Sequence, residues 1–526
     1  MIHPSFAPVE KADDFLRILP VYRYKKGLSS RDWRSFMSEG LKHIPEDFFF
    51  QEDLEEWGLL SLEDTLTQMH FPTDREMYSR AKYRLIFEEF FRFLLQGKES
   101  ERRQATKISL PSDSVNTYAS TLPFPLTRAQ LRTLEEIKED FSKGRMMRRL
   151  LQGDVGSGKS IVAYYPMTQL AKLGMQSAYL APTDILARQQ FENFCALFPD
   201  IPTRFLSAST KDKEAVYDEL REAKALVVIG THALLQEGVA FSDLRLVVTD
   251  EQHRFGVAQR EQLHRKGREV HLLQMSATPI PRTLSLLLFG NMDQSILDEK
   301  PPGRYPIETR LISPVQLPDV YEQIKSGFAT GEKAYIVFPA IEENENASMA
   351  SLESEETMLK KVFGEQVAFL HGRMPAKEKE QILETFRTGE KMVLAATTLI
   401  EVGMDIPEAT RLLLRSAQQF GLSQIHQIRG RIGRNNQPAT CYLCAESAHI
   451  PERLEILVRE EDGFKIAEED LRLRGPGEIR GLRQHGDLDF EMADVIRHEP
   501  ILRRVHDLLD EATAKRYRNA RKEQKY

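Results

Sequence analysis

The sequence lacks long apolar segments. Although 41% of its 526 residues are hydrophobic, no apolar run reaches the roughly eighteen residues that a membrane-spanning helix needs. The opening residues MIHPSFAPVEKADD also lack the basic region and apolar core of a secretory signal. We therefore expect a cytoplasmic protein with no membrane partner.

Cysteine is scarce as well. The chain has three cysteines, too few for a disulfide framework. Two of them form Cys441-Tyr-Leu-Cys444 at the end of an apolar run, and the sequence has no second CxxC. Without further ligands this pair does not predict a zinc centre, which stays an alternative together with a redox pair.

An excess of positive charge is also missing. The formal net charge is -7, which excludes a generally basic nucleic-acid binder. It leaves room for a local basic groove, because phosphate contacts need clustered Lys and Arg and not a high overall pI. The length exceeds what one hydrophobic core supports, so we expect about three or four domains.

Short apolar runs that end in polar clusters are abundant. The runs RLLQGD, SAYLAPT, ALVVIGTH, RLVVTDE and VHLLQMSAT begin at Arg149, and AYIVFPAI, VAFLHG, MVLAAT, RLLLRS and ATCYLC follow Pro301-Pro302-Gly303. They are typical of buried parallel strands, and the segments between them can supply helices. The pattern predicts an α/β protein with two tandem doubly wound domains, in which ligands bind at the carboxyl ends of the strands.

The two ends of the chain have helical patterns. Thr73 and Glu76 form a capping-box pattern before an apolar-periodic segment, and Ser29 or Ser30 is placed to cap a helix through Leu41. The last forty residues or so are also helical in pattern. We predict a helical support at 1–110, α/β domains at 111–305 and 306–460, and a C-terminal region at 461–526.

A phosphate-binding loop follows the first apolar run. GDVGSGKS, residues 153–160, fits the P-loop pattern and lies between a strand and a helix. Its glycines let backbone N–H groups surround a phosphate at a helix N-terminus. Lys159 is expected to hold the β and γ phosphates of ATP, and Ser160 to coordinate Mg²⁺. The predicted nucleotide-binding residues are Gly153, Gly156, Ser157, Gly158, Lys159 and Ser160.

Two further positions extend this site. The strand LVVT ends in Asp250-Glu251-Gln-His253, which on its own is also typical of a solvent-exposed strand end. Two strands after a P-loop, it predicts that Asp250 holds Mg²⁺ and Glu251 polarises the attacking water. Upstream, the amide of Gln130 could read the edge of adenine by paired hydrogen bonds.

The second α/β domain has no P-loop but carries an arginine motif. In QIRGRIGR, residues 427–434, Gln427, Arg431 and Arg434 are candidate catalytic residues. Such a helix face is often a solvated surface. The spacing places both arginines on one side of a turn, suited to reaching the γ-phosphate as arginine fingers. ATP between the domains would close them, and hydrolysis would release them, as in a motor stroke.

Together these motifs resemble a known group of enzymes. GDVGSGKS, APT (181–183), GTH (230–232), DEQH, SAT (276–278), LHG (370–372), TTLIEVGMD (397–405) and QIRGRIGR resemble superfamily 2 helicases in order and spacing. DEQHRFG, SATPIPRTL, TTLIEVGMDIP and FKIAEEDLRLRGPGEIRGLRQHG are similar to the bacterial RecG branch-migration helicases. The resemblance runs from about His3 to at least Val495, and implies two RecA-like domains.

The resemblance also implies a function. It implies an ATP-dependent helicase on branched duplex DNA, such as stalled forks and Holliday junctions, in recombination and repair. LRLRGPGEIRGLRQHG, residues 471–486, would be the TRG motif that couples the motor to DNA, although its composition also fits a solvated loop. A monomer, single-stranded DNA-binding protein as a partner and absence of the N-terminal wedge domain are further expectations. The implied DNA and coupling residues are Thr183, Thr231, His253, His371, Thr397, Arg474, Arg480 and Gln484.

Other functions fit parts of the pattern. The motor of a transcription-repair coupling factor shares the TRG element, but would need a polymerase-interaction domain that the first hundred residues do not resemble. A nucleotide-switched binding module would not need Glu251, Arg431 and Arg434, which serve hydrolysis. A P-loop kinase would need an acceptor site that the second domain does not offer.

Overall fold

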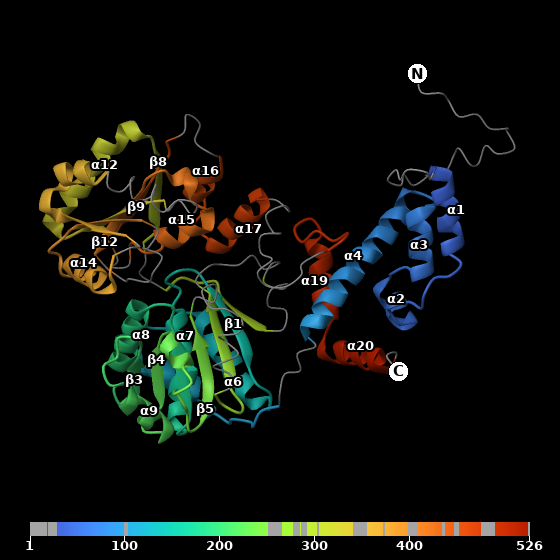
Figure 1. Cartoon of the computed structure of the whole chain (residues 1–526), viewed down its shortest axis with the longest axis horizontal. Helices are drawn as coiled ribbons and strands as arrows, with labels where there is room; N and C mark the ends of the chain where they lie inside the picture. The colour runs from blue at the N-terminus through green and yellow to red at the C-terminus, as the bar shows by residue number, and fades with distance from the viewer. Residues whose placement is uncertain are drawn as a thin grey trace. The chain divides into compact units, whose positions relative to one another are not determined.

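The chain folds into two compact units. One comprises Met1–Ser100, Leu286–Gly290 and Gly475–Tyr526, and the other Glu101–Ser285 and Asn291–Arg474. We call them the helical unit and the sheet unit (Figure 1). No helix among the described residues is long and apolar enough to cross a membrane. The computed structural model describes residues 18, 29–98, 104–250, 266–276, 285, 292–301, 305–339, 355–371, 374–397, 406, 408–433, 437–446, 452–474 and 490–523.

The first half of the sheet unit is a seven-stranded parallel sheet with the order β3-β4-β2-β5-β6-β1-β7. The five predicted strands are confirmed as β1, β2, β4, β5 and β6, and the edge strands β3 and β7 were not predicted. The strands are β1 (Arg148–Gly153), β2 (Gln176–Leu180), β3 (Thr203–Leu206), β4 (Val227–Gly230), β5 (Leu244–Thr249), β6 (His271–Ser276) and β7 (Asp293–Leu297).

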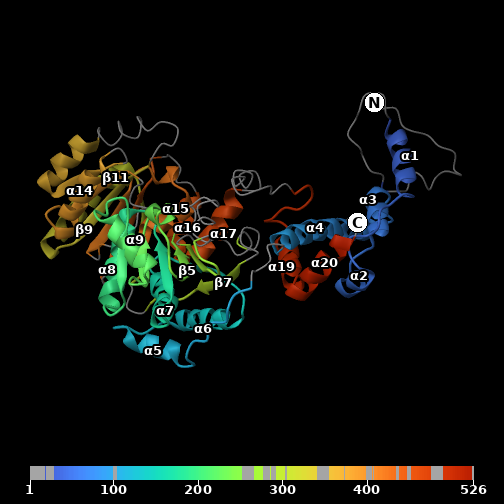
Figure 2. The ribbon, with the colours of Figure 1, turned by 60° about the horizontal axis from the view of Figure 1, so that its bottom comes forward.

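Helices cover both faces of this sheet. Helices α5, α6, α7 and α8 share one apolar core with it, and α9 and the 3-10 helix η2 share the other. Figure 2 shows α5 and α6 beside α7. The helices are α5 (Ser114–Thr121), α6 (Arg128–Ser142), α7 (Lys159–Lys172), α8 (Asp184–Leu197), α9 (Lys213–Arg221) and η2 (His232–Leu235).

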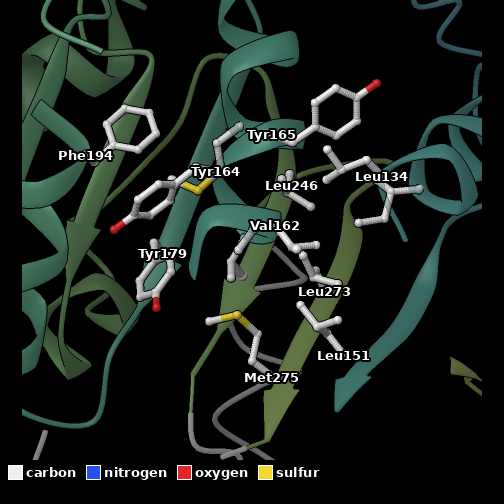
Figure 3. Close-up of a cluster of buried hydrophobic side chains, with 14 of the residues drawn as sticks. Leu134, Leu151, Val162, Tyr164, Tyr165, Tyr179, Phe194, Leu246, Leu273 and Met275 are labelled. Carbon is white, nitrogen blue, oxygen red and sulfur yellow. The ribbon is translucent and has the colours of Figure 1, made fainter. Parts of the chain in front are cut away.

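Helix α7 is the centre of the first core. Ten consecutive residues, Val162–Ala171, are buried, as expected for a helix packed on several sides. Figure 3 shows Val162, Tyr164 and Tyr165 of α7 against side chains of the sheet and of α6 and α8. This packing fixes α7, and with it the loop at its N-terminus, on the central strands.

The second half of the sheet unit is a six-stranded parallel sheet with the order β10-β11-β9-β12-β13-β8. Its predicted strands are confirmed, and β8 is an additional edge strand. Two doubly wound α/β sheets therefore stand in tandem, as predicted. The strands are β8 (Ile307–Ile312), β9 (Lys333–Phe338), β10 (Val367–Leu370), β11 (Val393–Thr397), β12 (Ala409–Leu414) and β13 (Ala439–Cys444).

Helices and 3-10 turns link these strands. They include α15, which carries the first part of the arginine motif, and α17, which ends at Arg474. The α-helices are α12 (Leu317–Ser326), α14 (Ala376–Thr388), α15 (Leu422–Arg429), α16 (Glu452–Arg459) and α17 (Gly463–Arg474). The 3-10 helices are η4 (Pro314–Gln316), η5 (Gly327–Thr330), η6 (Gly364–Gln366) and η8 (Ala417–Gln419).

The CxxC pair lies in β13, with its thiols on opposite faces of the sheet. Cys441 belongs to the core that contains Leu412, and Cys444 belongs to the core that contains Tyr321. Successive side chains of a strand alternate between faces, so residues three apart point away from each other. The two thiols cannot share a metal ion, and no metal-ligating cluster of His, Cys, Asp or Glu occurs among the described residues.

The described part of the helical unit contains six helices, and two of their starts were predicted. Ser29 caps α1 in a capping box with Asp32, as expected. The prediction that Thr73 caps α4 is wrong, because the N-cap residue is its neighbour Asp74. Asp74 Oδ1 accepts the Met77 N–H at 2.8 Å, because Thr73 is engaged by Gln68. The helices are α1 (Ser30–Gly40), α2 (Gln51–Trp57), α3 (Leu62–His70), α4 (Arg75–Lys98), α19 (Glu499–Leu508) and α20 (Glu511–Glu523).

The two ends of the chain share one core. Phe87 and Phe91 of α4 pack in one apolar cluster with Leu502 of α19 and Tyr517 of α20. The segments predicted as an N-terminal support and a C-terminal region therefore fold together in the helical unit. The boundaries predicted at residues 110, 305 and 460 stay a prediction.

Candidate nucleotide and DNA site

The P-loop connects β1 to α7 through glycines whose backbone conformation or close contacts disfavour other residues. Gly156 and Gly158 have φ values of 78° and 81°, a region that favours glycine. A Cβ on Gly158 would lie 2.3 Å from Gln130 Nε2, and one on Gly153 would lie 2.5 Å from Ser157 Oγ. The loop is therefore closed tightly over the N-terminus of α7.

The polar groups of this loop fit a phosphate. Lys159 Nζ lies inside it and donates to the carbonyl oxygens of Gly153 and Asp154 at 2.7 and 2.8 Å. Ser157 Oγ is buried and makes no hydrogen bond within the described part of the chain. The first amides of α7 have no acceptor within their own helix and form an anion site. A cation, a buried hydroxyl and the N-terminal amides of a helix thus converge, as nucleotide phosphates require.

Gln130 is buried next to the loop, and both ends of its amide are engaged. Its Oε1 accepts the Thr127 N–H at 2.8 Å in a capping box that starts α6, and its Nε2 donates to the Ser157 carbonyl at 2.9 Å. Thr127-Arg-Ala-Gln130 is the sequence pattern of such a box, so this signal was available and missed. Gln130 holds the P-loop in this structure, and its contact with adenine stays a prediction.

Asp250 follows β5 and receives a hydrogen bond that the sequence did not predict. Its Oδ2 accepts from the Tyr179 hydroxyl at 3.1 Å. Burial raises the pKa of Tyr179 well above its ordinary value, and the charge of Asp250 raises it further. The same hydroxyl also hydrogen-bonds the Ser160 side chain. Tyr179 of β2 therefore joins the two residues predicted to hold Mg²⁺ and keeps its proton there.

The arginine motif lies against the P-loop. Gln427 is half-buried in α15, and Arg431 is 8% exposed just beyond its end. Between them, a Cβ on Gly430 would lie 2.7 Å from Val155 Cβ of the P-loop. The structure thus brings Gln427 and Arg431 of the second sheet to the predicted nucleotide site, while their catalytic roles stay predictions.

Four of the predicted DNA-contacting residues lie at carboxyl ends of strands. Thr183 follows β2 and its side chain caps α8. Thr231 follows β4 at the N-cap position of η2, His371 follows β10, and Thr397 ends β11. Thr231 and Thr397 are buried, and the other two are half-buried. This placement at the sheet edges agrees with the sequence pattern, and contact with DNA stays a prediction.

Several predicted residues lie outside the described part of the chain. Arg474 ends α17 in the described backbone, but its side chain is not among the described ones. The roles of all these residues stay predictions. The residues outside the described part are Glu251, His253, Arg434, Arg480 and Gln484.

Comparisons with family models and with known proteins point to the same group of enzymes. Residues 127–287 match the DEAD/DEAH box helicase model, residues 319–436 the helicase conserved C-terminal domain, and residues 460–523 the C-terminal part of domain 3 of ATP-dependent DNA helicase RecG. The ATP-dependent DNA helicase RecG of Streptococcus pneumoniae is 41% identical over 498 residues, 92% of this chain and 74% of that protein. The chain belongs to the RecG family. The family inferred from the sequence motifs is confirmed.

Other RecG proteins show the extent of the match. RecG of Synechocystis sp. is 40% identical over 501 residues, which cover 92% of this chain and 60% of that protein. The solved structure of RecG bound to a three-way DNA junction has a TM-score of 0.70 and 37% identity, over 92% of this chain and 66% of that one. The chain thus spans about two thirds of the length of these relatives, and shares with them the tandem RecA-like fold.

Proposed function

We propose that this RecG-family chain is an ATP-driven motor that moves on duplex DNA and acts at branched DNA. The observation that carries the proposal is the site between the two sheets. The P-loop of the first sheet contacts His426 of α15 and Gly430, the residue before Arg431, in the second. A nucleotide bound there would contact both domains. A site shared by two domains lets hydrolysis change how they are held together.

The residues have distinct roles in hydrolysis. The P-loop amides and Lys159 bind the phosphates. Ser160 and Asp250 would hold Mg²⁺, which would neutralise charge on the phosphate oxygens. Glu251 polarises the attacking water. Gln427, Arg431 and Arg434 act from the second domain, where the arginines stabilise the charge that develops in the transition state.

Movement requires contacts with DNA. We assign Thr183, Thr231, His371 and Thr397 to the DNA backbone, because they lie at the strand ends of the two sheets. His253 couples the nucleotide site to that surface. The TRG segment, residues 471–486, begins in the last turn of α17. With Arg474, Arg480 and Gln484 it transmits domain movement to the duplex. Work at forks and junctions in recombination and repair, as a monomer and with single-stranded DNA-binding protein, belongs to the same proposal.

ATPase activity with different DNA structures tests this function. We expect stimulation by duplex DNA and by a synthetic fork above that by single-stranded DNA or no DNA. Lys159→Ala should abolish the activity, whereas Lys172→Ala at the exposed C-terminal end of the same helix should not change it. Stimulation by a protein partner alone would favour a transcription-coupling motor, and binding of ATP without turnover would favour a switch module.

A further inference from the structure

The P-loop makes a direct polar contact with the helix that carries the arginine motif. Asp154 Oδ1 lies 2.5 Å from His426 Nε2, although the two residues are 272 positions apart in the chain. Their side chains are only 14% and 6% exposed. Asp154 is the first residue after β1, and His426 lies in α15 next to Gln427. The contact therefore ties the first sheet to the second inside the nucleotide site.

The hydrogen bonds of His426 fix which of its nitrogens carries the proton. Arg429 Nη2 lies 3.0 Å from His426 Nδ1, and a guanidinium can only donate. Nδ1 is therefore the acceptor, so the proton of the neutral ring is on Nε2, which donates to Asp154. The ring is held in one orientation by its own domain and presents an N–H to the P-loop.

Arg429 is itself fixed by the second domain. It donates to the carbonyl oxygens of Leu457 and Glu460 at 2.6 and 3.1 Å and to Thr309 Oγ1 at 3.2 Å. These acceptors lie in or next to α16 and β8. The buried guanidinium of Arg429 thus holds the His426 ring in place, and these three other acceptors are groups of the second domain.

On the P-loop side, a second hydrogen bond fixes the carboxylate of Asp154. The oxygen that faces His426 also accepts the Val155 N–H at 2.7 Å. Burial alone would raise the pKa of Asp154, but hydrogen bonds from His426 and Val155 and the charge of Lys159 outweigh it and lower the pKa. Asp154 is therefore a carboxylate at neutral pH. Its Oδ1 accepts hydrogen bonds both from His426 of the second domain and from the backbone of the P-loop.

We propose that His426 is a positioning residue, which through Asp154 orders the P-loop only when α15 of the second domain is docked against it. The inference rests on ATP hydrolysis at this site, which it deepens. Because α15 leads directly to Gly430 and Arg431, the same contact sets the arginine segment beside the loop. Loss of the contact should therefore slow turnover more than it weakens ATP binding.

Steady-state kinetics of ATP hydrolysis with saturating duplex DNA provide the first test. His426→Ala and Asp154→Ala should each lower kcat about tenfold, the size expected for a hydrogen bond to a charged group, with a smaller change in KM. The double variant should be no slower than the slower single variant. His426→Gln and Asp154→Asn, which keep a donor and an acceptor, should stay within about threefold of the parent.

Hydrogen exchange of the P-loop amides, residues 153–160, provides a readout that does not depend on turnover. Without nucleotide, His426→Ala and Asp154→Ala should both speed exchange there, and His43→Ala, at an exposed histidine of the helical unit, should not. Unchanged exchange, or losses in kcat that multiply in the double variant, would overturn the inference. A parent protein without DNA-stimulated ATPase would instead count against the proposed function, while the exchange result would still decide the role of His426.

Discussion

Tyr179 is the aromatic residue of β2, and its hydroxyl connects Asp250 with Ser160. A phenol that keeps its proton is a donor, so it orients the carboxylate without adding charge. Residues of this kind hold a metal ligand in place and are often as important as the ligand itself.

Tyr179→Phe removes only that donor. Asp250 then loses the hydrogen bond that orients it. We therefore expect the Mg²⁺ concentration for half-maximal ATPase to rise about tenfold, as is typical when a hydrogen bond to a metal ligand is lost. Titration of the ATPase with Mg²⁺ measures this. Tyr165→Phe is the matched control, since the Tyr165 hydroxyl hydrogen-bonds Ser114 at 2.9 Å. Equal effects of the two variants would assign Tyr179 to packing alone.

Glu251 follows Asp250 and is predicted to polarise water. Glu251→Gln should retain ATP binding while turnover falls by a factor on the order of one hundred, because the amide cannot accept a proton. Binding of a fluorescent ATP analogue and steady-state hydrolysis measure the two effects. Glu237→Gln, at an exposed position of the same sheet domain, is the control. Near-normal turnover in Glu251→Gln would remove this residue from the role of base.

Burial controls the reactivity of the Cys441 thiol. Burial raises the pKa of its thiol to about 12. The neutral thiol is favoured in the folded chain, so its contribution to stability is complete below the ordinary thiol pKa and is lost as pH rises toward 12. At pH 8 we expect no alkylation of Cys441 in the native protein and full alkylation in urea, measured by mass spectrometry. Alkylation of native Cys441 at pH 8 would contradict its burial in β13.

At the scale of elements, α4 joins the two ends of the chain through Glu89. Its carboxylate accepts the backbone N–H groups of Glu491, Met492 and Ala493 at distances from 2.6 to 3.2 Å. These amides precede α19, so one side chain orders the approach of the C-terminal helices to α4. Carboxylates that accept several backbone N–H groups form strong, charge-assisted hydrogen bonds.

Glu89→Ala should destabilise the helical unit by about 2 kcal/mol, because it leaves three amides without their acceptor. The measurement is urea unfolding followed by tryptophan fluorescence, since the chain has two tryptophans and both, Trp33 and Trp57, lie in this unit. Lys82→Ala, at an exposed position of the same helix, is the control. An unchanged midpoint for Glu89→Ala would show that apolar packing alone joins the two ends.

The same scale shows what could be predicted from the sequence. Central strands such as β5 are apolar on both faces and were found. The edge strands β3 and β8 each interrupt the apolar run with polar residues and were missed. The P-loop was found because its spacing is local. The pairs Tyr179–Asp250 and Asp154–His426 were not, because they join segments 71 and 272 residues apart that only the folded sheets bring together.

For the whole molecule, we propose that hydrolysis between the two sheets drives movement along duplex DNA. In the proposed motor, hydrolysis belongs to the site around Lys159 and Arg431, and movement belongs to the TRG segment, which begins in the last turn of α17. If these are separate parts of one motor, mutation should separate their activities. Arg474→Ala and Gln484→Ala should retain much of the DNA-stimulated ATPase and lose most of the translocation.

Displacement of a triplex-forming oligonucleotide from duplex DNA, with ATP hydrolysis followed in the same sample, tests this claim most directly. We expect ATP-dependent displacement by the parent protein, none by Lys159→Ala, and continued hydrolysis with little displacement by Arg474→Ala and Gln484→Ala. Duplex-stimulated hydrolysis by the parent protein without any displacement of the third strand would contradict it.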